Sequence, residues 1–198
     1  MINLAAGNMN NIIKNEMTVF GRKLVENGLT TSFFGNISAY ENGVLYATKT
    51  GSMLDDLGDE NIVELFLDKE CPNDKLATTE LCVHKKIICE TGAKRVMHAH
   101  TVFSILAGDF FKEAACFAAA EILPFLKYVP VVTGKSGSDE LAVNVAEGLT
   151  MNKIVIVKDH GVFAVGDTLK ECYVYISGLE FYAKALMLKK LFVKNGII

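Results

Sequence analysis

The order of apolar and polar residues along the chain predicts five helices. The first, over residues 11–27, is amphipathic and stops at Gly28, a residue type that often ends helices. A second, over residues 78–91, would begin at a hydroxyl cap and end before Gly92. The other three are expected from residue 101 onward, over 138–149 with Ser136 or Ser138 as the cap, and over 168–194.

Short segments between these helices are expected to be strands. Residues 36–40 and 44–48 flank Glu41-Asn42-Gly43, which predicts a tight turn because Asn-Gly tolerates a positive φ. Further strands are expected over residues 61–67, 94–99 and 153–158. Because strands and helices do not alternate strictly, the pattern predicts an α/β fold with a mixed, largely antiparallel sheet.

Length and charge narrow the class of protein. The 198 residues fit a single domain over residues 1–198, long enough to bury a core without disulfides. The net charge of -3 argues against a nucleic-acid partner, which would need a basic face. Mean hydropathy is high at +0.28, but no run of about 18 apolar residues predicts a membrane span. The apolar excess instead suggests a subunit interface.

The cysteines indicate a reducing compartment. Their number is odd and their spacing matches no disulfide framework or paired metal site. Residues 1–11 lack a basic segment followed by an apolar core, so no signal peptide is expected. We therefore expect a cytoplasmic protein with reduced thiols at five positions: Cys71, Cys82, Cys89, Cys116 and Cys172.

Three of the four histidines stand at predicted strand ends. His98 and His100 form a His-Ala-His sequence, and side chains two residues apart on a strand point to the same face. His160 ends a second strand and precedes Gly161, where the backbone can turn sharply or approach another segment closely. These three imidazoles are therefore candidate ligands of one divalent ion. They would leave it an open position, which suits a Lewis acid better than a structural site.

The fourth histidine directs attention to a carboxylate. His84 lies four residues after Glu80, one turn along the same face of the predicted helix. An acidic residue in a first turn ordinarily complements the helix dipole. Because His84 and the His-Ala-His sequence follow so closely, Glu80 is also a candidate site residue.

Three segments are candidate anion-binding sites. Gly35-Asn36-Ile37-Ser38 and Thr48-Lys49-Thr50-Gly51-Ser52 combine turns with hydroxyls and exposed amides, and Thr78-Thr79 stands at a predicted helix N-terminus. Each is equally explained by turn chemistry or a helix cap. No single segment therefore assigns a phosphate site.

Taken in order, the motifs resemble the class II aldolase/adducin family. They are Gly35-Asn36-Ile37-Ser38, Thr50-Gly51, Thr79-Glu80 with His84, His98-Ala99-His100 and Asp159-His160-Gly161. The resemblance implies a three-layer α/β/α fold and a homotetramer with active sites between subunits. It also implies an aldolase that cleaves a short ketose 1-phosphate to dihydroxyacetone phosphate and a small aldehyde, or forms it from them.

The same resemblance implies roles for individual residues. His98, His100 and His160 would bind one divalent metal ion, and zinc is the expected ion. Glu80 would also bind the metal when substrate is absent and would be the general base when substrate is bound. Independently of the resemblance, Lys49 is a candidate source of positive charge beside the substrate phosphate. The phosphate itself would be bound by Gly35, Asn36, Thr50, Gly51, Thr78 and Thr79.

Other activities stay open. Pentulose-phosphate 4-epimerases of the superfamily carry Asp where Glu80 stands, so Glu80 favours the aldolase. Metal-dependent sugar-phosphate dehydratases and decarboxylases are compatible with the motifs. A non-catalytic adducin-type head is disfavoured, because such modules lose metal ligands that this chain has.

The chain departs from the family pattern where the aldehyde would bind. Cys116 stands at the position of one expected tyrosine, and a second tyrosine would belong to a tail beyond Ile198. Glu121 and Tyr128 are candidate replacements. We therefore expect weaker selection of the aldehyde than of the phosphorylated half.

Overall fold

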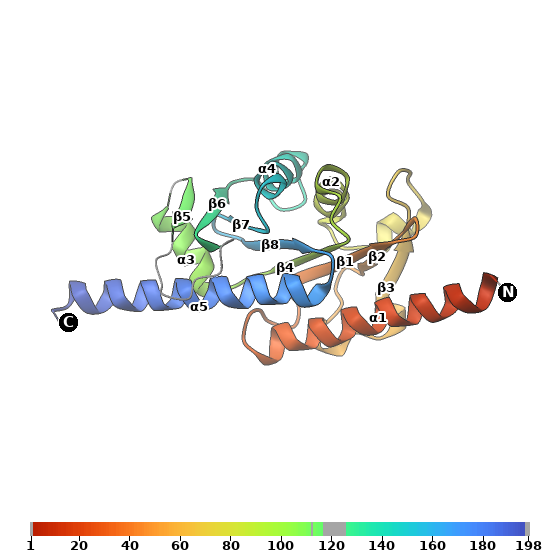
Figure 1. Ribbon diagram of the computed structural model, residues 1–198, viewed down its shortest axis with the longest axis horizontal. Helices are drawn as coiled ribbons and strands as arrows, with labels where there is room; N and C mark the ends of the chain where they lie inside the picture. Colours follow the sequence, from red (N-terminus) through yellow and green to blue (C-terminus); the bar gives the residue numbers. More distant parts are fainter. Residues whose placement is uncertain (1, 112, 117–125, 197–198) are drawn as a thin grey trace.

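The computed structural model describes residues 2–111, 113–116 and 126–196, and its centre is one mixed sheet (Figure 1). Within these residues, eight strands follow in the order β3-β2-β1-β4-β8-β7-β6-β5. Among the strands that the structure describes, only β6 and β7 pair in parallel, which confirms the predicted largely antiparallel sheet. The strands are β1 (Gly35–Glu41), β2 (Val44–Thr48), β3 (Ile62–Leu65), β4 (Arg95–Ala99), β5 (Ala114–Cys116), β6 (Tyr128–Val132), β7 (Ile154–Val157) and β8 (Gly161–Gly166).

Helices cover both faces of the sheet and give the fold three layers. Figure 1 shows α2 and α4 side by side on one face, with α1, α3 and α5 on the other. As far as the structure describes them, none of these helices combines the length and apolar character of a membrane span. The helices are α1 (Ile2–Glu26), α2 (Leu81–Thr91), α3 (Val102–Phe110), α4 (Asp139–Thr150) and α5 (Leu169–Lys194).

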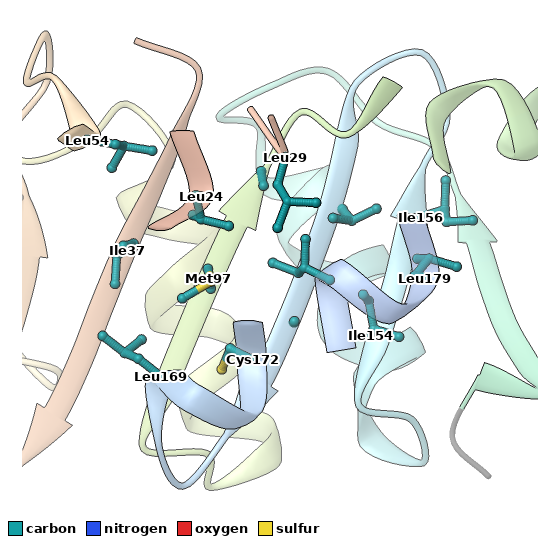
Figure 2. Close-up of a cluster of buried hydrophobic side chains, with 14 of the residues drawn as sticks. Leu24, Leu29, Ile37, Leu54, Met97, Ile154, Ile156, Leu169, Cys172 and Leu179 are labelled. Atoms are coloured by element: carbon teal, nitrogen blue, oxygen red, sulfur yellow. The ribbon is translucent and has the colours of Figure 1, made fainter. Parts of the chain in front are cut away.

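Two apolar cores lie on the two faces because side chains alternate along each strand. In β7, Ile154 and Ile156 face the core under α5, while Val155 and Val157 face the core under α2 and α4. Met97 of β4 lies in the first of these cores (Figure 2). A strand covered on both faces needs apolar residues throughout, which explains the unbroken Ile-Val-Ile-Val sequence of β7.

Hydrogen bonds show where two of the expected helices begin. Ser138, not Ser136, caps α4, and its hydroxyl accepts from the Leu141 amide at 3.1 Å. The expected hydroxyl cap of the second helix is wrong. α2 begins at Leu81 with Glu80 at the cap position, because the Thr78 amide instead donates to the Thr48 carbonyl at 2.9 Å. Thr78 is thereby tied to the end of β2, and both threonines lie outside the helix.

The sequence pattern did not predict three of the strands or the first turns of α1. α1 begins at Ile2 rather than at residue 11. The pattern also missed β5, β6 and β8. Pro130 weakens the strand signal of β6, and β8 is a short run between two glycines. β8 is stabilised by pairing with β4 on one side and β7 on the other, and such pairing is not a local property.

Candidate active site

One end of the sheet is hollowed where β1, β2, β4, the turn before β8 and the start of α2 meet. The cavity has a volume of about 160 Å³. His98 lies beneath it with no exposed surface. Nine of the ten residues proposed from the sequence line it, namely Gly35, Asn36, Thr50, Gly51, Thr78, Thr79, Glu80, His100 and His160.

Two glycines allow the strands to approach closely at this end. A Cβ atom at Gly161 would lie 2.5 Å from the carbonyl oxygen of Ala99 and 3.0 Å from Cε1 of His98. A Cβ atom at Gly35, whose φ is +120°, would lie 2.5 Å from the carbonyl oxygen of His98. Both contacts are too short for any side chain, so glycine is required for β1 and β8 to flank the histidine strand at this point.

The predicted histidine cluster forms. One ring nitrogen from each of His98, His100 and His160 lies within 4.8 Å of the others. The Nε2 atoms of His98 and His100 are 3.0 Å apart. His160 is the last residue of the turn between β7 and β8, directly before Gly161, rather than at the end of the preceding strand, where it was expected. Asp159 in the same turn has a positive φ of 57°, which brings the chain back towards β4.

The donor set fits a divalent ion. Nδ1 of His98 lies 2.9 Å from the Val162 carbonyl oxygen, so this nitrogen carries the proton and the lone pair of Nε2 faces the cluster. Burial lowers the pKa of His98 well below its usual value and that of His100 to about 4. Both rings are therefore neutral, as metal ligands must be. Tetrahedral zinc at about 2.0–2.1 Å from each nitrogen separates its ligands by about 3.3 Å, close to the 3.0 Å between Nε2 of His98 and Nε2 of His100.

Glu80 lies against this cluster and is 3% exposed. Its Oε2 is 3.2 Å from Nε2 of His98, and its Oε1 is 3.5 Å from Nε2 of His160. Two neutral groups hold the carboxylate from the other side. Asn36 donates its amide to Oε2 at 3.0 Å, and Ser136 donates its hydroxyl to Oε1 at 3.1 Å.

Opposite the histidines, the cavity wall carries hydroxyls and turns. The backbone amide of Thr50 donates to the Leu76 carbonyl at 3.1 Å, and that of Thr78 is also used within the fold. These two residues therefore offer a ligand their hydroxyls rather than their amides. Gly51 turns the chain with φ of 74°, and Lys49 lines the same wall. The arrangement brings a hydroxyl-rich wall and a nitrogen-rich wall into one small cavity.

Sequence reasoning missed several residues of this site. Ser136 was considered only as a helix cap, although it contacts Glu80. Phe34 stacks on His100 with ring centroids 5.3 Å apart, and no pattern in the sequence signals this contact.

Tyr128 lies on β6, opposite Cys116 on β5, and is 55% exposed, outside the lining of the cavity. Glu121 lies outside the described residues.

Comparison with known proteins identifies the family to which this fold belongs. The sequence profile of a family described as "Class II Aldolase and Adducin N-terminal domain" matches residues 15–187. The chain therefore belongs to the class II aldolase and adducin family. Relatives in this family are named as aldolases, so the chain is an enzyme of the class II aldolase type, with a lyase activity.

Individual relatives are similar along most of their length. An L-fuculose phosphate aldolase of Methanocaldococcus jannaschii is 30% identical over 175 residues, covering 87% of this chain and 94% of the relative. The crystal structure of L-fuculose-1-phosphate aldolase from Thermus thermophilus has a TM-score of 0.85 and 28% identity, with 91% and 95% coverage. A 3-oxo-tetronate 4-phosphate decarboxylase of Pectobacterium atrosepticum is 27% identical over 187 residues, with 87% and 83% coverage.

Proposed function

We propose that this protein is a zinc-dependent aldolase that cleaves a short ketose 1-phosphate to dihydroxyacetone phosphate and a small aldehyde, and that also catalyses the reverse reaction. The observation that carries the proposal is the convergence of three imidazoles and one buried carboxylate on one side of a hydroxyl-lined cavity. The names of the relatives from Methanocaldococcus jannaschii and Thermus thermophilus support the same substrate class.

In this proposal the three histidines hold the metal ion. His98, His100 and His160 supply nitrogen ligands, and Glu80 is close enough to be a fourth ligand before substrate binds. A bound divalent ion would act as a Lewis acid that stabilises negative charge on the carbonyl oxygen of the substrate. The open side of the cluster faces the cavity, which leaves room for substrate oxygens.

Glu80 is the proposed general base. In the direction of aldol formation, its carboxylate removes a proton from the hydroxymethyl carbon of dihydroxyacetone phosphate. In the cleavage direction it returns that proton to the same carbon. Burial beside the histidine cluster limits the access of water to the carboxylate, and the hydrogen bonds from Asn36 and Ser136 fix its direction.

The opposite wall is the proposed phosphate site. The hydroxyls of Thr50, Thr78 and Thr79 face the same cavity as the turn at Gly51, and Lys49 adds a positive charge. The side chain of Asn36 already donates to Glu80, so the contribution of Gly35 and Asn36 to phosphate binding would come from their backbone. Holding the phosphate there places the reacting carbon between it and Glu80.

A decarboxylase is the second candidate. The relative from Pectobacterium atrosepticum is named for that reaction and is nearly as similar as the aldolases. Both reactions leave negative charge on a carbon next to a carbonyl, so the same cluster serves either. The deciding experiment incubates the zinc-loaded protein with a panel of ketose 1-phosphates and with 3-oxo-tetronate 4-phosphates. Release of dihydroxyacetone phosphate together with an aldehyde from a ketose 1-phosphate supports the aldolase. Decarboxylation of a 3-oxo-tetronate 4-phosphate also yields dihydroxyacetone phosphate, so release of carbon dioxide from that substrate, with no cleavage of any ketose 1-phosphate, would replace the aldolase with the decarboxylase.

Assembly and compartment belong to the same proposal. Large apolar side chains are exposed on α3 and α5, among them Phe110 at 58%, Phe181 at 67% and Leu191 at 52%. Covering them in a homotetramer would remove this surface from water. Cys71, Cys82, Cys89 and Cys172 are free thiols, which supports a cytoplasmic setting. Light scattering at micromolar concentration tests the tetramer, and an active monomer would contradict it.

A further inference from the structure

Behind Glu80, a line of hydrogen bonds leads away from the cavity into the core. The Ser38 hydroxyl lies 2.6 Å from Nδ1 of His84, and Nε2 of His84 lies 2.5 Å from Oδ1 of Asn36. Asn36 then donates its Nδ2 to Oε2 of Glu80 at 3.0 Å. Ser38 and His84 have no exposed surface, and Asn36 is 7% exposed. We call Ser38, His84 and Asn36 the buried relay.

Only one assignment of protons satisfies every member of the buried relay. The Glu80 carboxylate only accepts, so Asn36 must turn its NH2 group towards it and its carbonyl oxygen towards His84. Nε2 of His84 must then carry the proton, which leaves Nδ1 to accept from the Ser38 hydroxyl. A charged ring would place a second donor against that hydroxyl. Burial lowers the pKa of His84 to about 3, so the ring is neutral and has the one donor and one acceptor required.

The fold fixes this line through two layers of secondary structure. Asn36 and Ser38 alternate with the core residue Ile37 on β1, so both point to the face that α2 covers. His84 descends from α2 onto that face, one turn after Glu80. Its ring also meets the edge of Phe163 at 5.9 Å. Strand, helix and carboxylate are thus held in one register.

We infer that His84 is a positioning residue for Glu80: it orients the Asn36 amide, which fixes the direction of the carboxylate, while Ser38 selects the ring tautomer. This inference rests on the proposed role of Glu80 as base. His84 itself is not the base, because both ring nitrogens are engaged and the ring does not line the cavity. Without the His84 donor, the Asn36 oxygen would be buried without a partner, and the amide would lose its fixed orientation.

Two substitutions separate this role from simple packing. His84→Phe keeps a planar ring but removes both hydrogen bonds. His84→Gln keeps an amide donor for Asn36. Ile87→Val is the matched control, because Ile87 is a buried apolar residue of the same helix, one turn further on, and takes no part in the hydrogen bonds of the relay.

The expected results differ among these variants. For His84→Phe we expect kcat for ketose 1-phosphate cleavage to fall about 10- to 100-fold, with KM changed less than about threefold. Zinc affinity of the metal-free protein, measured by competition with a chelator, should fall about tenfold. His84→Gln should recover most of both losses. Ile87→Val should lower only the thermal midpoint. Equal losses in all three variants, or wild-type kcat and zinc affinity in His84→Phe, would overturn the inference.

A spectroscopic measurement tests the relay in the unmodified chain and needs no substrate. Nitrogen-15 NMR of histidine-labelled, metal-free protein should show His84 as the tautomer protonated at Nε2, with Nδ1 unprotonated at neutral pH. Ser38→Ala should weaken that preference. Protonation at Nδ1 would overturn the inference even where the aldolase activity is established. Absence of aldolase activity in the unmodified protein would instead count against the proposed function, because it leaves the tautomer and zinc measurements intact.

Discussion

The two ends of the central sheet are both hollowed, yet they differ in chemistry. At the end where β4 stops, a cavity of about 160 Å³ is bordered by Glu80, His100 and His160. At the other end a larger cavity of about 430 Å³ lies between the end of α2, the start of β7 and the start of α5. Its lining includes Lys153, Asp167 and Glu171. The smaller hollow is the one with convergent imidazoles, so size does not identify the site.

One carboxylate at each end of the sheet, Glu171 or Glu80, shows why the two cavities differ in chemistry. Oε2 of Glu171 accepts the backbone amides of Asp167 and Thr168 at 2.7 and 3.2 Å, as part of the capping box of α5. Its charge is used to begin a helix. Glu80 instead meets the side chains of His98, His160, Asn36 and Ser136. A carboxylate with side-chain partners in a cavity is available for chemistry, whereas one that accepts backbone amides is structural.

Removal of the metal should have the largest effect on activity, and it should act at the end of the sheet that carries the histidine cluster. We expect cleavage of the ketose 1-phosphate to fall by roughly 10³-fold or more after exhaustive chelation, since Lewis-acid stabilisation contributes several kcal/mol to the transition state. Added zinc should restore activity. Elemental analysis of the purified protein should find about one divalent ion per chain, and His98→Ala should abolish its binding. Full activity in rigorously metal-free protein would contradict the role of the histidine cluster.

Replacing Glu80 or Glu171 with glutamine, one at a time, tests the difference between the two carboxylates directly. Glu80→Gln should lower turnover by about 10²- to 10⁴-fold, because the proposed base is lost. The measurement is exchange of the hydroxymethyl proton of dihydroxyacetone phosphate in deuterated water. Glu171→Gln is the control and should retain full exchange, with a loss of stability of about 1 kcal/mol from the weakened cap. Undiminished exchange in Glu80→Gln would place the base elsewhere.

Low pH should lower the stability of the folded protein, because the buried histidines near the cavity resist protonation. The folded-state pKa of His84 is lowered to about 3, whereas the ring in the unfolded chain titrates near 6.5. Below that value the unfolded chain takes up a proton that the folded protein refuses, so stability falls as pH falls. The loss is about 1.4 kcal/mol for each pH unit between the two values.

The measurement for this pH effect is urea unfolding of metal-free protein between pH 7 and 5. His84→Gln removes the titrating ring, so its stability should fall less steeply with pH than that of the unmodified chain. Parallel curves for the two proteins would show that His84 is not responsible for the loss.

The smallest effect is expected at the rim of the larger cavity. Met151 is 90% exposed there, so Met151→Gln should change the free energy of unfolding by less than about 0.5 kcal/mol. The ratio kcat/KM should be unchanged. A clear loss of activity would show that the far end of the sheet takes part in function and would erase the distinction between the two hollows.

Local patterns predicted much of this protein correctly. The His-Ala-His sequence on β4 required only the two-residue period of a strand to direct both rings to one face. The helix that ends at Gly92 and the hairpin turn at Asn42-Gly43 followed equally from short-range rules. β8 and the capping of α2 did not follow. The first depends on partners on both sides, and the second on a bond between Thr78 and the end of β2.

The sequence by itself determined the family, the α/β class, the candidate metal ligands and the candidate carboxylate, because each is a matter of residue type and near spacing. Only the tertiary structure decided which groups Glu80 meets. Asn36 and Ser136 are 44 and 56 residues away from it in the chain. The Asn36 contact depends on the register of β1 beside β4 and on the packing of α2 against β4. The Ser136 contact depends on the packing of α2 against α4, which follows Ser136 in the chain. Hydrogen bonds are short and directional, so partners this distant in sequence are selected by the assembled layers.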